Sequence, residues 1–111
     1  MTPWLKRFLN RKPTGKPLRG APQVRREKAY SADTGYVYQY FYEGYRDAER
    51  AGDPGREYVF EVASDRASRF PVTVFLSLQT VDTWRQAHGS ALSPTEQYAV
   101  VKMSLFQTFD Q

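Results

Sequence analysis

Apolar and polar residues alternate with a period of two in three stretches of the chain, 36–45, 56–64 and 71–78. This alternation is typical of β-strands that bury one face. Short segments rich in turn-forming residues separate the stretches, and the first of them contains the sequence Gly-Asp-Pro-Gly at 52–55. Three consecutive strands joined by short connections predict an antiparallel meander.

Two helices are predicted after the strands. Residues 80–88 carry apolar side chains at helical spacing, and Gly89 is expected to end that helix. The sequence Ser-Pro-Thr-Glu at 93–96 has the residues of a capping box, and the helix that it begins is expected to reach Phe109. The predicted fold is therefore α+β, with the three-stranded antiparallel meander packed on two C-terminal helices in the order β-β-β-α-α.

The first predicted strand carries a row of tyrosines on one side. The row consists of Tyr36, Tyr38, Tyr40 and Tyr42, and the opposite row of Val37, Gln39, Phe41, Glu43 and Tyr45. The tyrosines either pack in the core or form an exposed platform for stacking bases. The core interpretation matches the apolar rows of the other two strands, which are Tyr58, Phe60 and Val62, then Val72, Val74 and Leu76. It leaves an outer-face interaction patch made of Phe41, Val59 and Phe75.

Residues 1–29 differ in composition from the rest of the chain. They are rich in Pro, Gly and charged residues, and such a segment cannot bury enough apolar surface to offset the entropy of ordering. We therefore predict a largely disordered arm over 1–29 and one small α+β domain over 30–111. Within the arm, residues 3–11 have the spacing of a short amphipathic helix that is too short to be stable alone.

Positive charge is concentrated in this arm. The 111-residue chain has a net charge of +4, but residues 1–29 contain nine Lys or Arg and one acid, whereas the remainder contains seven Lys or Arg and eleven acids. The arm cations are candidate contacts to an anionic partner: Lys6, Arg7, Arg11, Lys12, Lys16, Arg19, Arg25, Arg26 and Lys28. Such a partner is a nucleic acid, through its phosphates, or an anionic membrane surface.

The sequence contains few residues of the kinds that metal or catalytic sites use. There is no cysteine, His88 is the single histidine, and no nucleotide-binding motif is present, so we expect no metal, no cofactor and no catalytic centre. Glu57 and Glu61, with Glu43 across from them, are read as a solvated outer sheet face; the alternative is a carboxylate pair. Lys102 lies among apolar helix positions, either with its stem along that face or as a buried base or anion-binding group.

These observations predict a small non-catalytic protein-interaction module. Its partner is another protein or a second copy of the chain at the outer-face patch, with the basic arm for an anionic partner. The alternatives are nucleic-acid binding through the arm and peripheral attachment to anionic membranes through residues 3–11. The absence of cysteine, of a secretory signal and of a long apolar run favours the cytoplasm.

Overall fold

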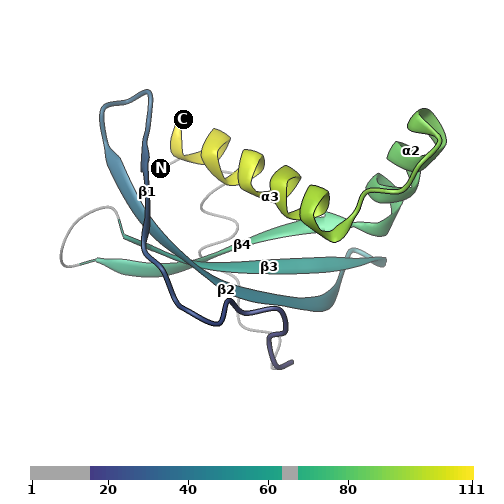
Figure 1. The fold of residues 1–111 in the computed structure, drawn as a ribbon, viewed down its shortest axis with the longest axis horizontal. Helices are drawn as coiled ribbons and strands as arrows, with labels where there is room; N and C mark the ends of the chain where they lie inside the picture. The colour runs from purple at the N-terminus through teal and green to yellow at the C-terminus, as the bar shows by residue number, and fades with distance from the viewer. Residues whose placement is uncertain (1–15, 64–67) are drawn as a thin grey trace.

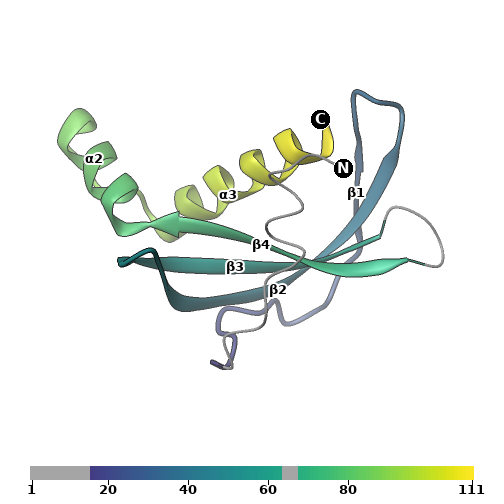
Figure 2. The same cartoon turned by 180° about the vertical axis from the view of Figure 1, so that it is seen from behind.

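The computed structural model describes residues 16–63 and 68–111. The elements are β1 (Lys28–Ser31), β2 (Val37–Arg50), β3 (Asp53–Ala63), β4 (Arg69–Ser77), α2 (Leu78–His88) and α3 (Pro94–Phe109). The strands form one antiparallel sheet in the order β1-β2-β3-β4. The sheet is strongly bent, α3 lies across its concave face, and α2 projects beyond one end (Figure 1; Figure 2 shows the same from behind).

The predicted α+β class, antiparallel sheet and two helices are confirmed, but the sheet has four strands and not three. The additional strand, β1, starts at Lys28 inside the range expected to be an arm. Sequence composition could not reveal it, because the free edge of β2 supplies its backbone partners and Phe106 stacks on Tyr30 with ring centroids 4.3 Å apart. The predicted helix over 3–11 lies outside the described residues.

The hairpin between β2 and β3 is longer than expected. Residues 46–55 were predicted to form a connection, but β2 continues to Arg50, and the turn consists of Ala51 and Gly52 alone, both with positive φ (50° and 86°). Two such residues form a tight hairpin turn whose twist suits the flanking strands. Opposite charges then face each other across the extension, as in the pair of Arg46 with Glu57.

The core lies between α3 and the tyrosine side of the sheet, as the core interpretation predicted for Tyr38, Tyr40 and Tyr42. The prediction was wrong for Tyr36, because it precedes β2 and is exposed. The sheet contributes Tyr40, Tyr58, Phe60, Val62, Val72, Val74 and Leu76, and α3 contributes Val101, Leu105 and Phe109. Stacking of Tyr38 on Phe109, with centroids 4.3 Å apart, extends this core toward β1. Aromatic rings supply much of the buried area in a small domain.

A β-bulge corrects the predicted position of Tyr45. The register of β2 against β3 shifts between Tyr42 and Gly44, so that Tyr45 pairs with Tyr58 on the tyrosine side and not on the opposite row. Gly44 has a φ of 123°, and a Cβ atom there would lie 2.6 Å from the carbonyl oxygen of Arg19. That close approach accompanies two backbone hydrogen bonds between Arg19 and Tyr45, of 2.7 and 2.8 Å.

The helix ends follow the sequence closely. The capping box is present, with the Glu96 carboxylate accepting from the Ser93 N–H (3.0 Å) and the Ser93 hydroxyl accepting from the Glu96 N–H (3.2 Å). Gly89 ends α2 in the left-handed conformation, as predicted. No residue of α2 is buried, and of its residues only Val81 packs against the core cluster, so α3 provides most of the cover of the sheet.

Replacing Gly44 by alanine is expected to lower the free energy of unfolding more than the same change at Gly35. Both glycines have positive φ, which costs alanine about 1 kcal/mol at either position. Only at Gly44 does the new Cβ meet other atoms within 4 Å. Urea unfolding measures the difference, and amide exchange at Arg19 and Tyr45 reports the loss of their pairing; equal losses of stability would contradict the prediction.

Tyr30→Phe is expected to make the free energy of unfolding fall less steeply as the pH rises into the alkaline range. The hydroxyl donates a 2.6 Å hydrogen bond to Asp110, which together with burial raises the pKa of Tyr30 to about 12 from an ordinary value of 10.0. Because the folded-state pKa is the higher one, this contribution is complete below pH 10 and is lost as the pH rises through 12. Unfolding free energies across that range test it. Tyr36→Phe, which removes an exposed hydroxyl, should leave the dependence unchanged.

Candidate functional site

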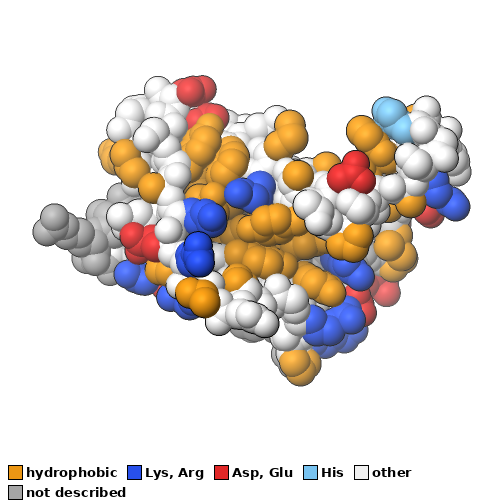
Figure 3. Space-filling model, in the orientation of Figure 1, with side chains coloured by type: hydrophobic (Ala, Val, Ile, Leu, Met, Phe, Trp, Pro, Cys, Tyr) orange, Lys and Arg blue, Asp and Glu red, His pale blue; other side chains and the backbone are white. Residues whose placement is uncertain are grey.

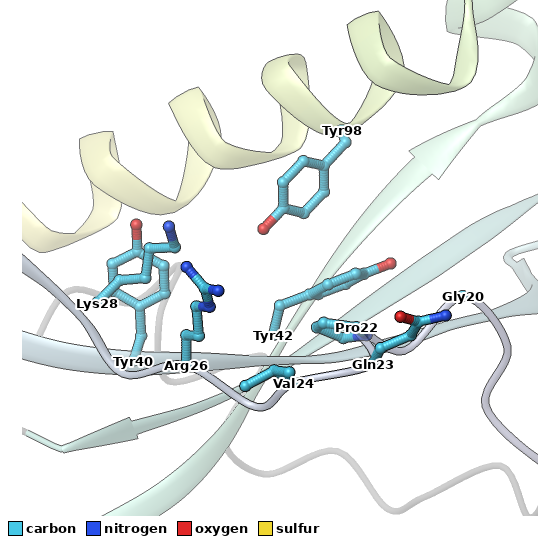
Figure 4. Close-up of a pocket in the computed structure, with 9 residues that line it drawn as sticks. All are labelled: Gly20, Pro22, Gln23, Val24, Arg26, Lys28, Tyr40, Tyr42 and Tyr98. Atoms are coloured by element: carbon cyan, nitrogen blue, oxygen red, sulfur yellow. The ribbon is translucent and has the colours of Figure 1, made fainter.

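A cavity of about 490 Å³ opens between α3, β2 and the segment that precedes β1. We call it the tyrosine cavity. Its lining consists of Gly20, Pro22, Gln23, Val24, Arg26, Lys28, Tyr40, Tyr42 and Tyr98 (Figure 4). Two layers of the fold therefore meet there, because Tyr40 and Tyr42 belong to β2 and Tyr98 belongs to α3.

The wall formed by residues 20–28 stands away from the sheet for a topological reason. Arg19 pairs with Tyr45, and Lys28 pairs with Tyr40, so the chain is attached to the β2 edge at both ends. Between these attachments residues 20–27 lie opposite only 41–44, and the longer segment must bow outward. Apart from Gln23, it lines the cavity with alternate residues, as an extended chain does.

Arg25 fastens this wall to the outer face of the sheet. Its Nε donates to Glu43 (2.9 Å), one Nη donates to Glu61 (2.9 Å), and its guanidinium lies 3.7 Å from the centre of the Phe41 ring. Each contact is partly exposed and contributes little alone. Together they determine which side of the segment faces outward, so that the neighbouring Arg26 faces the cavity.

The tyrosines give the cavity apolar walls with neutral hydroxyl groups. Tyr40 is buried, and Tyr42 and Tyr98 are half-buried with ring centroids 4.8 Å apart. Burial raises the pKa of all three, and neighbouring tyrosine hydroxyls raise the pKa of Tyr42 and Tyr98 further. The hydroxyls therefore stay protonated at neutral pH, able to donate and accept hydrogen bonds.

Three cations adjoin these walls. Arg26 and Lys28 extend from the outer segment toward α3 (Figure 4). Lys102, on α3, holds its Nζ 5.7 Å from the Tyr98 ring centre and 5.6 Å from that of Phe106. Within the described ranges none of the three forms an ion pair. Figure 3 shows basic side chains bordering an apolar hollow on this face. The site is thus apolar inside and positive at its border.

The other predicted arm residues have different surroundings. Arg19 forms an ion pair with Asp47 (3.0 Å), and Lys16 contributes its carbonyl oxygen to Arg46 (3.3 Å). The guanidiniums of Arg19 and Arg25 are thus bound to acids of the sheet, whereas Arg26 and Lys28 line the cavity. Four further candidates lie outside the described residues: Lys6, Arg7, Arg11 and Lys12.

The predicted interaction patch lies on the outer face. The strand registers place Val59 diagonally between Phe41 and Phe75, and all three side chains are half-buried. The guanidinium of Arg25 lies over Phe41, and that of Arg50 lies 5.1 Å from the Phe75 ring centre. The patch therefore already has cationic contacts within the chain.

The outer-face glutamates are not a solvated row. Glu57 is fully buried and accepts from Arg46 Nε (3.0 Å) and Nη2 (2.9 Å), while Glu43 and Glu61 share Arg25. The prediction failed at Glu57 because the backbone of Lys16 also bonds Arg46. A buried carboxylate needs such a partner, since an unpaired charge in the interior is very costly.

His88 and Lys102, the two isolated candidates for catalytic chemistry, have different surroundings. His88 is exposed in the last turn of α2, where its ring stacks on Trp84 at 3.7 Å. Lys102 is half-buried along the apolar face of α3. No group of three or more metal-binding side chains occurs among the residues that the structure describes.

Comparison of the chain with protein-family models, curated proteins and solved structures finds no significant match. Of the helices in the described ranges, none has both the length and the apolarity needed to cross a membrane. Any assignment of function must therefore come from the chemistry of the site itself.

The cavity could not be predicted from the sequence. The sequence pointed to Arg26 and Lys28 as arm cations and to Tyr40 and Tyr42 as core residues. It did not indicate that Pro22, Val24 and Tyr98 line the same cavity. A weak signal was available at the start of the segment only, where the apolar Pro22 and Val24 alternate with the polar Gln23 and Arg25. Such alternation is typical of an extended segment with two different environments.

Arg25→Gln is expected to loosen the cavity wall with a small loss of overall stability. The substitution removes two partly exposed ion pairs and the stacking on Phe41, together worth on the order of 1 kcal/mol. Amide exchange of residues 20–27 should accelerate more than that of β3. Arg85→Gln is the matched control, because it removes an exposed 3.7 Å pair with Asp82 on α2. Unchanged exchange in 20–27 would show that Arg25 does not hold this segment.

Proposed function

We propose that the protein is a non-catalytic binding module that takes up an anionic ligand with an apolar body in the tyrosine cavity. The observation that carries this proposal is the pair of cations, Arg26 and Lys28, that face an apolar cavity without an acidic partner among the described residues. The proposal keeps the anionic partner that the basic arm suggested, and assigns its binding site to the tyrosine cavity.

The charge pattern supports this assignment. Where this segment faces the outer side of the sheet, the chain supplies acids for its cations, as Glu43 and Glu61 do for Arg25. Where it faces the cavity, the lining contains no acid. A guanidinium and an ammonium two residues apart suit one carboxylate, phosphate or sulfonate group, and charge-assisted hydrogen bonds of this kind are the stronger ones.

The lining also favours binding over chemistry. It contains no carboxylate, histidine, serine or cysteine, which are the side chains that most nucleophile and general-base pairs use. Burial raises the pKa of the tyrosine hydroxyls and keeps them protonated at neutral pH. The volume lies within the range of about 300–1,000 Å³ typical of small-molecule sites.

The other proposals have less support. Nucleic-acid binding requires arm cations that are free for phosphates, yet Arg19 and Arg25 are bound to acids of the sheet. Self-association at the outer-face patch would have to displace the guanidiniums of Arg25 and Arg50, which lie over Phe41 and Phe75. The membrane proposal depends on residues 3–11, which lie outside the described ranges.

The proposal is tested with 8-anilinonaphthalene-1-sulfonate, an aromatic anion whose fluorescence rises on transfer to an apolar site. We expect saturable binding to the full chain and about tenfold or greater weakening in Arg26→Glu, because a charge-assisted contact is replaced by repulsion. Arg85→Glu carries the same change of net charge on α2 and should bind as the parent does. Circular dichroism confirms that each variant is folded.

Nile red, a neutral apolar dye, separates the two parts of the site. Its binding should survive Arg26→Glu, because it relies on the tyrosine walls alone. If Arg26→Glu and Arg85→Glu bind the anionic probe equally well, the probe is held elsewhere and the proposal is wrong. A parent protein that shows no saturable binding would also overturn it.

A further inference from the structure

We infer that the ligand of the tyrosine cavity is a small planar aromatic acid, in which a flat ring system carries one carboxylate, phosphate or sulfonate group. This inference rests on the proposed function and adds the ligand's size and shape. Three observations carry it: the closed edge of β2, the arrangement of the rings, and the backbone of Tyr42.

The first observation excludes an extended polypeptide along β2. Such a partner would have to pair with the strand edge over several residues. That edge is occupied on both sides of the cavity, by Arg19 against Tyr45 and by β1 against residues 37–40. The residues between are too few for a paired strand, so the cavity suits a compact molecule.

The second observation is the wedge formed by the rings. Tyr42 rises from the sheet, Tyr98 descends from α3, and the two planes meet at 49° with centroids 4.8 Å apart (Figure 4). Tyr40 lies beside Tyr42 on the same face of β2. Aromatic pairs gain energy from offset-stacked and edge-to-face contacts beyond the area that they bury, whereas an acyl chain gains only from area. Walls of this composition therefore favour a flat ring.

The third observation is a backbone donor and acceptor at the cavity. In an antiparallel strand every second residue turns its N–H and C=O to the same neighbour. The carbonyl of Tyr36 accepts from Ala32 (2.8 Å), and the pairs of Tyr38 and Tyr40 with β1 continue this alternation. Tyr42 comes next, but β1 ends at Lys28. No backbone hydrogen bond joins Tyr42 to the described residues 16–27, so its N–H and C=O are available for a polar substituent on the ring.

The cations fix the orientation of such a ligand. Arg26 and Lys28 lie on the same side of an extended segment, so both reach one acidic group on the ligand. Lys102 stands beyond Tyr98 on the opposite layer. The acid then lies at the border of the cavity. The ring lies against the open sides of Tyr42 and Tyr98, because these two rings, with centroids 4.8 Å apart, leave no room for a third ring between them.

The test compares 2-naphthoate with decanoate by titration calorimetry on the full chain, with 2-naphthamide as the uncharged control. Decanoate has the larger apolar surface, so area alone predicts that it binds at least as tightly. We expect 2-naphthoate to bind about tenfold more tightly than decanoate, from ring contacts on two walls. The amide should bind at least tenfold more weakly than the acid.

Tyr98→Leu tests the role of the ring while retaining apolar volume. It should weaken 2-naphthoate about fivefold and leave decanoate unchanged. Tyr36→Leu, at an exposed tyrosine outside the cavity, should change neither. If decanoate binds as well as 2-naphthoate, or if Tyr98→Leu weakens both acids equally, the aromatic ligand class is wrong.

The variant Arg26→Glu separates this failure from failure of the proposed function. Suppose that the parent protein binds both acids equally well and that Arg26→Glu weakens the binding of both. The proposed anion-binding module is then supported, and only the aromatic ligand class is wrong. If Arg26→Glu weakens neither acid, the anionic site itself is wrong. Absence of binding by both acids, while the anilinonaphthalene probe binds through Arg26, would also overturn the ligand class.

Discussion

Backbone pairing between the N-terminal segment and the free edge of β2 is the constraint on which the rest of the structure depends. It is made at two places, by Arg19 with Tyr45 and by β1 with residues 37–40. The excess of chain between these places creates the cavity wall. The same pairing brings the backbone of Lys16 to the outer face, where its carbonyl accepts from Arg46, the partner of the buried Glu57. One edge interaction thus organises both faces of the sheet.

The bulge at Gly44 makes this pairing possible and changes the chemistry of β2 along its length. Before the bulge, alternate residues place Tyr40 and Tyr42 toward α3 and Phe41 outward. After it, the alternation moves by one residue, so that Tyr45 remains on the tyrosine side and Arg46 faces Glu57 outside. If the same residues continued as a regular strand without the bulge, Arg46 would lie on the tyrosine side, because a one-residue shift exchanges the two faces.

The sequence was sufficient for elements whose signals are local. The capping box at 93–96 and the alternation in β3 and β4 depend on neighbouring residues, and both were predicted correctly. The features that were missed depend on distant partners. Composition made residues 16–29 resemble part of a disordered arm, yet their backbone partners on the free edge of β2 lie 10 to 26 residues further along the chain. The bulge left no clear local signal beyond Gly44, and the cavity required Tyr98, whose partner Tyr42 lies on a different layer.

The distribution of charge along this segment carries the functional argument further than net charge does. Arg25 and Arg26 are adjacent, yet one binds two glutamates and the other faces tyrosines, because an extended chain sends neighbouring side chains to opposite sides. Glu43 and Glu61 neutralise the charge of Arg25 and hold the segment in place, and Arg25 does not line the cavity. An acid beside Arg26 would instead compete with any anionic ligand. This asymmetry between two identical side chains supports the anion-binding site that we propose, and a uniformly solvated basic arm would lack it.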